Sequence, residues 1–382
     1  MRKIAIITSL FSKNTYDGAN FYVRILVQHL SKLAKVIILT TSSFDNLPKS
    51  VSSKNNIQIL LFPLEKNSQH SQFNRLTHYL FQEKKHTSAQ EELWLKLSGS
   101  YSPLLLRYLK ENFDNYDFFF FIGYANALTY FGLPLVKSKA ILIPLTHKEP
   151  LLQFKIFDKI FSSPVIILPS TFAEKDLIKS KFLSLPPLFI TGININKPKF
   201  PKKVPVFLSK PYFIYIGRVS RLKGVFELID YFIEVKNRNI IDHKLILIGK
   251  NTDFVQIPKH NDIIHFEYIS QERKYSLLSE AEFLINPSYY ESLSLSLLES
   301  WSLKKPVLAN ARCDVLKSQI DKANGGLYYE DFEEFEMMIN WLIRHPRQQQ
   351  ILGNNGYRYT QKNYSPQIIQ KKIKILLDTL TN

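Results

Sequence analysis

The sequence has only one cysteine and few glycines. Cys313 is the single cysteine among 382 residues, so the chain cannot form an internal disulfide bond. This excludes a small disulfide-stapled scaffold and favours a reducing compartment, with the cytoplasm as the expected location. The twelve glycines are about half of ordinary usage, so each glycine is expected to have a structural reason.

Several motifs of well-known enzyme classes are missing. No Gly-x-Gly-x-x-Gly follows a predicted strand, and the sequence has no Walker loop, no His-Glu-x-x-His and no cysteine pair. These absences argue against dehydrogenases, P-loop kinases and zinc hydrolases. No Asp-x-Asp triplet is present to hold a metal diphosphate. We therefore expect no metal site and no cofactor.

Long uninterrupted hydrophobic runs are also missing. The apolar run after Arg2 and Lys3 is too short for a signal peptide and fits a first β-strand better. Residues 118–136 are uncharged and long enough to cross a membrane, but polar residues, a proline and glycines interrupt them. The segment instead predicts a buried parallel strand over 118–122 that ends at Gly123.

Basic residues exceed acidic ones along the whole chain. The 50 Lys and Arg against 33 Asp and Glu give a net charge of +17, divided as +10 over residues 1–192 (23 minus 13) and +7 over residues 193–382 (27 minus 20). A nucleic acid, an anionic membrane and an anionic substrate all fit this excess, because net charge reports on non-specific association rather than on chemistry.

Short apolar runs alternate with helical patterns twice along the chain. Strands are expected at 3–8, 36–40, 57–62, 118–122, 140–144 and 165–169, and again at 212–216, 244–248, 263–268, 283–285 and 306–309. Helices are expected at 18–34, 224–237 and 365–380, and residues 66–113 are mostly helical and basic. Residues 193–212, rich in proline and lysine, suit an inter-domain connection. The sequence thus predicts two α/β halves with a ligand cleft at the carboxyl ends of their strands.

The segment 217–224 offers cationic groups for a phosphate. Gly217 closes a buried strand, Arg218 supplies a bidentate fork, and Lys223 adds a point charge where a helix begins. Gly249 closes the next strand in the same way. An ordinary strand–turn–helix with solvated basic residues is an equally good interpretation of this segment by itself.

Two glutamates flank the start of a second helix. Ser292 or Ser294 can cap a helix that runs to about Leu303, and its free N–H groups would form an anion site. Glu291 lies just before this helix and Glu299 lies about two turns inside it, so the two carboxylates can reach opposite ends of an extended ligand. By spacing alone, a surface ion pair between Glu299 and a residue such as Lys304 is the simpler interpretation.

These motifs together resemble the family 4 glycosyltransferases of the GT-B fold, which retain anomeric configuration and need no metal. The resemblance covers nearly the whole chain and includes Asp17-Gly18-Ala19, the Gly-Arg…Lys-Gly segment at 217–224, the two glutamates, and Lys-Pro-Val at 305–307. The segments 146–150 and 324–329 are similar to a bacterial surface-polysaccharide branch, which includes lipopolysaccharide synthesis. The family implies two Rossmann-like doubly wound domains that face each other across a cleft: an acceptor-side domain at 1–192, with a returning helix at 365–382, and a nucleotide-sugar donor domain at 193–364.

The resemblance also implies roles for individual residues. It makes Glu291, His147, Arg218 and Lys223 catalytic. It assigns Gly217, Gly249, Ser292, Leu293, Ser294, Leu295 and Glu299 to donor binding, and Asp17 and Gly18 to an acceptor-side loop. The chain departs from the family where serines replace glycines after Glu291, and where Lys148 follows His147 in place of an aspartate.

The implied activity is transfer of a sugar from a nucleotide-sugar to a glycan or lipid-linked acceptor. A nucleotide-sugar epimerase of the same fold is one alternative, and a non-enzymatic basic protein that binds nucleic acid or membrane is another, although no specific nucleic-acid motif is present. Basic and aromatic residues mix over 75–110, including Lys84 and Lys85. This stretch favours a peripheral position on the anionic inner face of the cytoplasmic membrane, and an ordinary basic helical insertion is the competing interpretation.

Overall fold

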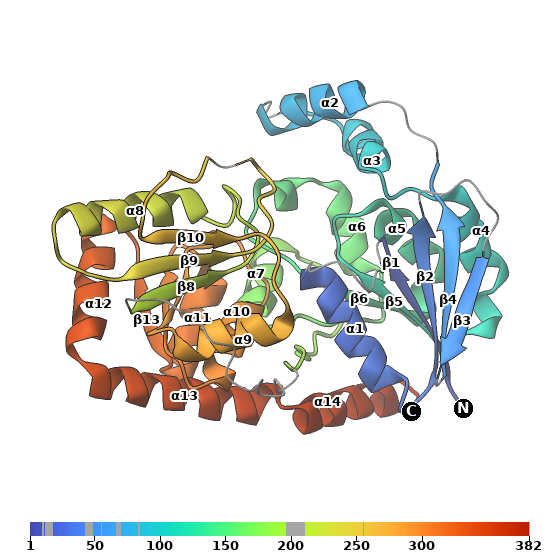
Figure 1. Ribbon diagram of the computed structural model, residues 1–382. Coiled ribbons are helices and arrows are strands. Elements are labelled where there is room, and N and C mark those ends of the chain that lie inside the picture. Colours follow the sequence, from blue (N-terminus) through green and yellow to red (C-terminus); the bar gives the residue numbers. More distant parts are fainter. Residues whose placement is uncertain are drawn as a thin grey trace. The chain divides into compact units, whose positions relative to one another are not determined.

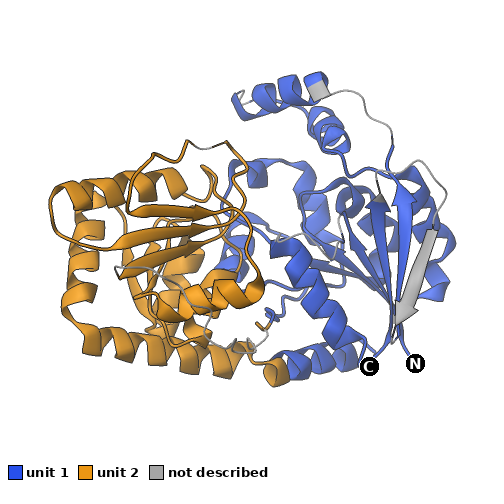
Figure 2. Ribbon diagram, viewed as in Figure 1, with its two compact units in different colours: residues 1–193, 369–382 blue, residues 194–368 orange. Residues whose placement is uncertain are grey.

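The computed structural model describes residues 1–9, 11, 18–42, 49–54, 56–65, 70–82, 85–195, 211–254 and 256–381. The chain divides into two compact units, which Figure 2 shows in different colours. The first unit contains residues 1–193 and 369–382, and the second contains residues 194–368.

The first unit is built on a seven-stranded sheet in the order β3-β4-β2-β1-β5-β6-β7 (Figure 1). Its strands are β1 (Lys3–Thr8), β2 (Lys35–Ser42), β3 (Lys49–Lys54), β4 (Ile57–Pro63), β5 (Phe118–Ile122), β6 (Ala140–Ile143) and β7 (Ile166–Ile167). All neighbours pair in parallel except β3, which runs antiparallel to β4 at the edge. Each residue of β5 is buried, as expected for a strand inside a parallel sheet that helices cover on both faces.

Helices connect the strands of this sheet. They are α1 (Gly18–Leu30), α2 (His70–Gln82), α3 (Ser88–Leu97), α4 (Pro103–Glu111), α5 (Ala127–Gly132), α6 (Ile156–Ser162) and α7 (Phe172–Lys181), with 3-10 turns at Phe113–Asn115, Leu133–Lys139 and Pro150–Gln153. One core contains many aromatic side chains, among them Phe119, Phe121, Tyr124, Phe157 and Phe161.

The second unit is built on a six-stranded sheet in the order β10-β9-β8-β11-β12-β13. Its strands are β8 (Tyr212–Ile216), β9 (Lys244–Ile248), β10 (Ile263–Phe266), β11 (Leu284–Asn286), β12 (Val307–Asn310) and β13 (Gly326–Tyr329), and all pair in parallel. Its helices are α8 (Val225–Asn237), α9 (Gln271–Glu280), α10 (Leu295–Ser302), α11 (Asp314–Ala323), α12 (Phe332–Arg344) and α13 (Pro346–Tyr364). Helices α8 and α12 share one core with β8 and β9, through residues such as Phe213, Phe232 and Phe335.

The last helix, α14 (Pro366–Thr379), belongs to the first unit for most of its length. Its buried face contains Ile369, Ile373, Leu376 and Leu377. Polar contacts reinforce this packing, since Arg2 forms an ion pair of 3.2 Å with Asp378. The Nδ1 atom of His29 on α1 also lies 2.7 Å from Oε1 of Gln370.

The sequence analysis predicted an α/β fold with two successive halves, and the structure confirms this. The analysis assigned no strand to 49–54 or 326–329, so β3 and β13 are additions. Neither segment has the sequence pattern expected of a strand. Residues 49–54 are mostly polar, and β13 begins with a glycine, which is unfavourable in strands. Gly326 is needed there because a Cβ atom would lie 2.0 Å from the carbonyl oxygen of Val307 on the neighbouring strand.

Candidate active site

The loops after β8 and β11 meet at one point of the second sheet. Strand β8 lies between β9 and β11, so the strand order reverses there, and ligands of open α/β sheets bind at such a point. Gly224, the N-cap of α8, has φ of +67°, and a Cβ atom at this position would lie 2.1 Å from the carbonyl oxygen of Pro287. Only glycine permits so close an approach of the two loops.

Lys223 and Glu291 form an ion pair across these two loops. Nζ of Lys223 donates to Oε1 of Glu291 at 2.7 Å and to the carbonyl oxygen of Tyr290 at 3.1 Å. The two side chains are 20% and 16% exposed, so the pair is largely shielded from water. An ammonium group has three N–H donors, and these two bonds leave one for a ligand.

Arg218 lies exposed just beyond β8. Its guanidinium forms no hydrogen bond or ion pair with any residue in the described ranges, whereas its backbone carbonyl accepts a 2.6 Å bond from the hydroxyl of Tyr215. Burial, with a smaller contribution from Glu291, raises the pKa of Tyr215, so this hydroxyl keeps its proton. The backbone at Arg218 is therefore fixed while its cationic side chain is available.

Two glycines bring the ends of β8 and β9 together. The N–H of Gly217 donates to the carbonyl of Ile248 at 2.9 Å, and Gly249 has φ of +145°. A Cβ atom on Gly249 would lie 1.9 Å from the carbonyl oxygen of Gly217. The structure gives these two glycines a structural reason, because the backbone of one strand end closely approaches the backbone of the other.

Ser294 caps helix α10. Its hydroxyl accepts from the N–H of Leu297 at 3.4 Å and from the side-chain amide of Asn286, at the end of β11, at 2.9 Å. Of the two serines proposed as caps, Ser294 takes this position, and Ser292 and Leu293 are buried in the loop before it. Helix α10 begins at Leu295, and the backbone N–H groups of its first turn point out of its N-terminal end. The helix dipole favours an anion at this end.

Glu299 lies inside α10 and pairs with residues of α9. Its Oε1 accepts from Nζ of Lys274 at 2.7 Å and from the hydroxyl of Tyr275 at 3.1 Å. The interpretation of a surface pair with Lys304 is therefore wrong, because the carboxylate is buried and Lys304 instead lies over the ring of Tyr357. Burial, together with the neighbouring Glu299, raises the pKa of Tyr275.

The two carboxylates share one feature. Both Glu291 and Glu299 place Oε1 on a lysine ammonium, at 2.7 Å in each case. Within the part of the chain that the structure describes, no residue donates to Oε2 of either one. Each carboxylate is therefore oriented by one oxygen and keeps acceptor capacity on the other.

His147 lies in the first unit, after β6. Its Nδ1 atom is 3.4 Å from Oε1 of Glu149, and the same oxygen accepts a 2.9 Å bond from the hydroxyl of the buried Tyr124. Burial would raise the pKa of Glu149, but the contacts with His147 and Tyr124 outweigh burial and lower it. An acidic partner for His147 is thus present two residues later, although Lys148 occupies the adjacent position.

Glu174 is a residue that the sequence analysis missed. It is fully buried on α7, and its two carboxylate oxygens each accept a 2.6 Å bond from a backbone N–H, one from Thr146 and one from Ser170. Burial raises its pKa to about 7, although the two N–H donors oppose this shift. Leu145, beside Thr146, has φ of +53°, which is uncommon for a residue other than glycine. Glu174 therefore holds the backbone that leads into His147.

The remaining predicted features are less informative. Asp17 lies outside the described residues, and Gly18 is the first residue of α1.

In the described ranges, no three His, Cys, Asp or Glu side chains come together in a way that could hold a metal ion. None of the helices that the structure describes is both long and apolar enough to cross a bilayer.

The family match falls within the second unit of the chain. Residues 196–359 match the family described as glycosyl transferases group 1. The capsular polysaccharide biosynthesis glycosyltransferase CapM of Staphylococcus aureus is 22% identical over 197 residues, which cover 48% of this chain and 50% of CapM. The chain spans about half the length of the curated relatives that it matches.

Solved structures resemble the chain over its whole length. Sucrose-phosphate synthase from Thermosynechococcus elongatus superimposes with a TM-score of 0.76 at 16% identity, covering 100% of this chain and 99% of that one. HepE from Anabaena, solved in complex with UDP-glucose, gives a TM-score of 0.72 at 12% identity, covering 99% and 100%. The chain therefore has the fold of the GT-B glycosyltransferases, and its residues 196–359 carry the sequence pattern of glycosyl transferases group 1.

Proposed function

We propose that the protein is a retaining glycosyltransferase that needs no metal and moves a sugar from a nucleotide-diphosphate sugar to a glycan or lipid-linked acceptor in surface-polysaccharide synthesis. The observation that carries this proposal is the shared geometry of Glu291 and Glu299, each with one oxygen on a lysine and one oxygen available. Two oriented acceptors on one helix and its preceding loop suit the hydroxyl groups of a donor sugar and a ribose.

The cationic groups suit the leaving group. Breaking the bond between the anomeric carbon and the diphosphate leaves negative charge on a phosphate oxygen. The acceptor hydroxyl bonds to the same carbon and gives its proton to this phosphate oxygen. Arg218, the third N–H of Lys223 and the first turn of α10 can stabilise that charge without a metal ion. In this proposal, His147 contacts the donor sugar, and Glu149 orients its ring.

A nucleotide-release assay tests the proposal. UDP-sugars are the first donors to try because the Anabaena protein of the same fold was solved with UDP-glucose. We expect release of the nucleoside diphosphate that rises when a glycan acceptor is added, and Glu299→Gln should raise KM for the donor more than it lowers kcat. Glu272→Gln on the exposed first turn of α9 is a matched control.

Analysis of the nucleotide sugar in the same incubations separates the alternatives. An epimerase would convert the nucleotide sugar to its epimer without an acceptor, and a non-enzymatic protein would leave every nucleotide sugar unchanged. NMR of the anomeric proton in the product decides between retention and inversion.

We also propose peripheral association with an anionic membrane. Tyr79 and Phe81 on α2 are 39% and 44% exposed, and Lys85 follows them in an exposed position. Trp94, in contrast, is buried and donates to Thr77, so it supports α2 and α3 rather than a lipid contact. Exposed rings beside basic residues suit an anionic lipid surface.

A further inference from the structure

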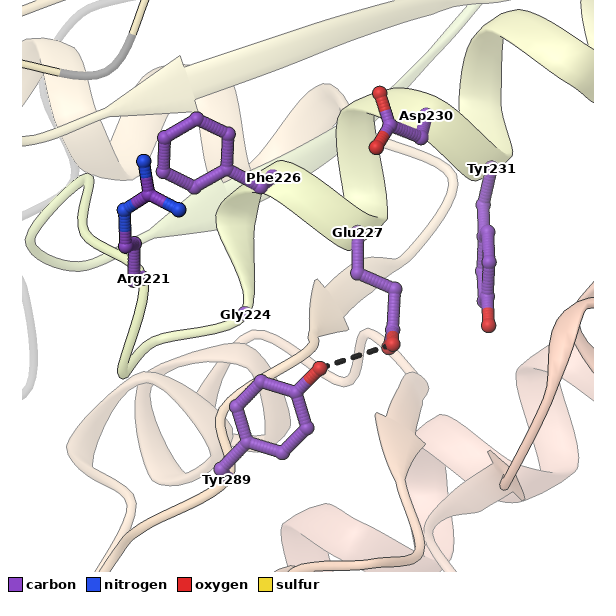
Figure 3. Close-up of a pocket in the computed structure, with 7 residues that line it drawn as sticks. All are labelled: Arg221, Gly224, Phe226, Glu227, Asp230, Tyr231 and Tyr289. Atoms are coloured by element: carbon purple, nitrogen blue, oxygen red, sulfur yellow. Dashed lines mark hydrogen bonds between the residues drawn. The ribbon is translucent and has the colours of Figure 1, made fainter. Parts of the chain in front are cut away.

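A pocket lies on α8, apart from the side chains of the proposed donor site. It has a volume of about 400 Å³, which is within the range of small-molecule sites. It is lined by Arg221, Gly224, Phe226, Glu227, Asp230, Tyr231 and Tyr289 (Figure 3). Apart from the backbone of Gly224, none of these residues belongs to the proposed donor site.

Interlocking contacts fix one wall of this pocket. The hydroxyl of Tyr289 donates to Oε2 of Glu227 at 2.9 Å, as Figure 3 shows, and Oε1 of Glu227 pairs with Arg312. The guanidinium of Arg312 also lies 5.0 Å from the ring centre of Tyr289. The ring of Tyr289 and the carboxylate of Glu227 therefore hold their positions before any ligand arrives.

Charges of both signs surround the pocket, and acidic groups are in excess. Glu227 and Asp230 contribute two negative charges and Arg221 and Arg312 two positive ones, but the carboxylates of Asp331 and Glu333 also act electrostatically on Tyr231. Arg221 already lies 4.7 Å from the ring centre of Phe226, so this ring face is occupied by a cation. The pocket therefore disfavours a phosphate or another anion.

The lining suits an uncharged ligand that carries hydroxyl groups. Figure 3 shows the rings of Tyr231 and Tyr289 on either side of the Glu227 carboxylate, and Asp230 is exposed at the rim. Aromatic faces bind the C–H face of a ring, and carboxylates accept from hydroxyl groups. We propose that this pocket binds a pyranose unit of a neutral glycan, as a site separate from the nucleotide-sugar site.

The two sites share one loop but not their side chains. Tyr289 bonds to Glu227 on α8, whereas Glu291, two residues later, bonds to Lys223. A sugar in the pocket should therefore bind without displacing a nucleotide. The pocket proposal does not depend on the proposed activity, because its contacts belong to α8 and Tyr289.

Saturation-transfer NMR with glucose, galactose, N-acetylglucosamine and maltose tests this inference on the full chain. We expect signals from at least one of these sugars, a loss of affinity of at least tenfold in Tyr231→Ala, and unchanged signals in saturating UDP. Tyr268→Ala is the matched control, since it removes a 60% exposed tyrosine that does not line the pocket. Because Tyr231 also contacts the ring of Phe332, the exposed Asp230→Ala is a second variant that spares the packing.

The outcomes are distinct. Weaker sugar binding in Tyr231→Ala and Asp230→Ala, with UDP having no effect, supports the site. The inference is overturned if no sugar binds, if UDP displaces the sugar, or if both variants bind as the unmodified protein does. Failure of nucleotide release with sugar binding intact would reject the proposed activity alone.

Discussion

Replacing Glu174 with glutamine tests whether the buried carboxylate of α7 supports the loop that carries His147. The carboxylate receives one backbone N–H on each oxygen, from Thr146 and from Ser170. Glutamine keeps one acceptor oxygen and presents an NH₂ group to the other N–H. A buried N–H left without an acceptor costs about 1–3 kcal/mol, so we expect Glu174→Gln to lower the free energy of unfolding by about this amount.

The pH dependence of this loss follows from the pKa of Glu174. Burial raises that pKa from 4.5 to about 7 in the folded state, so between these values the folded chain binds more protons than the unfolded chain. The stability that comes from the protonated carboxyl is complete below about pH 4.5 and is lost as the pH rises through about 7. The shift corresponds to about 3 kcal/mol. Glutamine does not titrate, so the variant should lack this slope.

Urea unfolding at pH 5, 6, 7 and 8 measures both effects, and hydrogen exchange at the amides of Thr146 and Ser170 localises them. Glu111→Gln, at an exposed position of the same unit, is the control and should change neither quantity. We expect the deficit of Glu174→Gln to be largest at pH 5 and to shrink as the pH rises. A deficit that widens with pH would refute the reasoning, because the two N–H donors would then outweigh burial.

Four further outcomes are expected. Lys223→Ala and Glu291→Ala should each lower transfer by roughly a hundredfold with unchanged circular dichroism, and a folded variant with full activity would remove its residue from the site. Activity should survive a strong chelator; loss that magnesium restores would contradict a metal-free reaction. Gly224→Ala should lower Tm, since its positive φ and the close carbonyl make any Cβ strained by about 1–3 kcal/mol. Charge reversal at Lys85, alone or with Lys84, which lies outside the described residues, should weaken salt-sensitive binding to anionic vesicles, and equal binding to neutral vesicles would argue against membrane association.

Most strands of the two sheets, all but β3 and β13, could be predicted from the sequence because they are short apolar runs with clear ends. Phe118–Ile122 is bounded by Asp117 and Gly123, and Lys244–Ile248 is followed by Gly249. The loops after β8 and β11 could be found for the same reason, since each follows such a run. What these loops bind remains a prediction.

The partners of the site residues could not be predicted, because they come from elements far apart in the chain. Nothing near Glu299 in the sequence indicates that Lys274, on the preceding helix, reaches its carboxylate. Glu174 looks like any acidic residue in the first turn of a helix, and only the fold shows that it is buried. Glu149 differs from these residues, because it lies only two residues after His147 and their contact is local.

The position of α14 has a consequence for deletion experiments. The chain passes from the first unit to the second near residue 193 and returns near residue 369, so the first unit is assembled from two separate stretches of sequence. A protein shortened before Pro366 would lose the partners of Arg2 and His29 and would uncover apolar surface on the first unit. If such a truncated protein is inactive, the cause would be a damaged fold of the first unit. Adding residues 366–382 as a separate peptide should then restore activity.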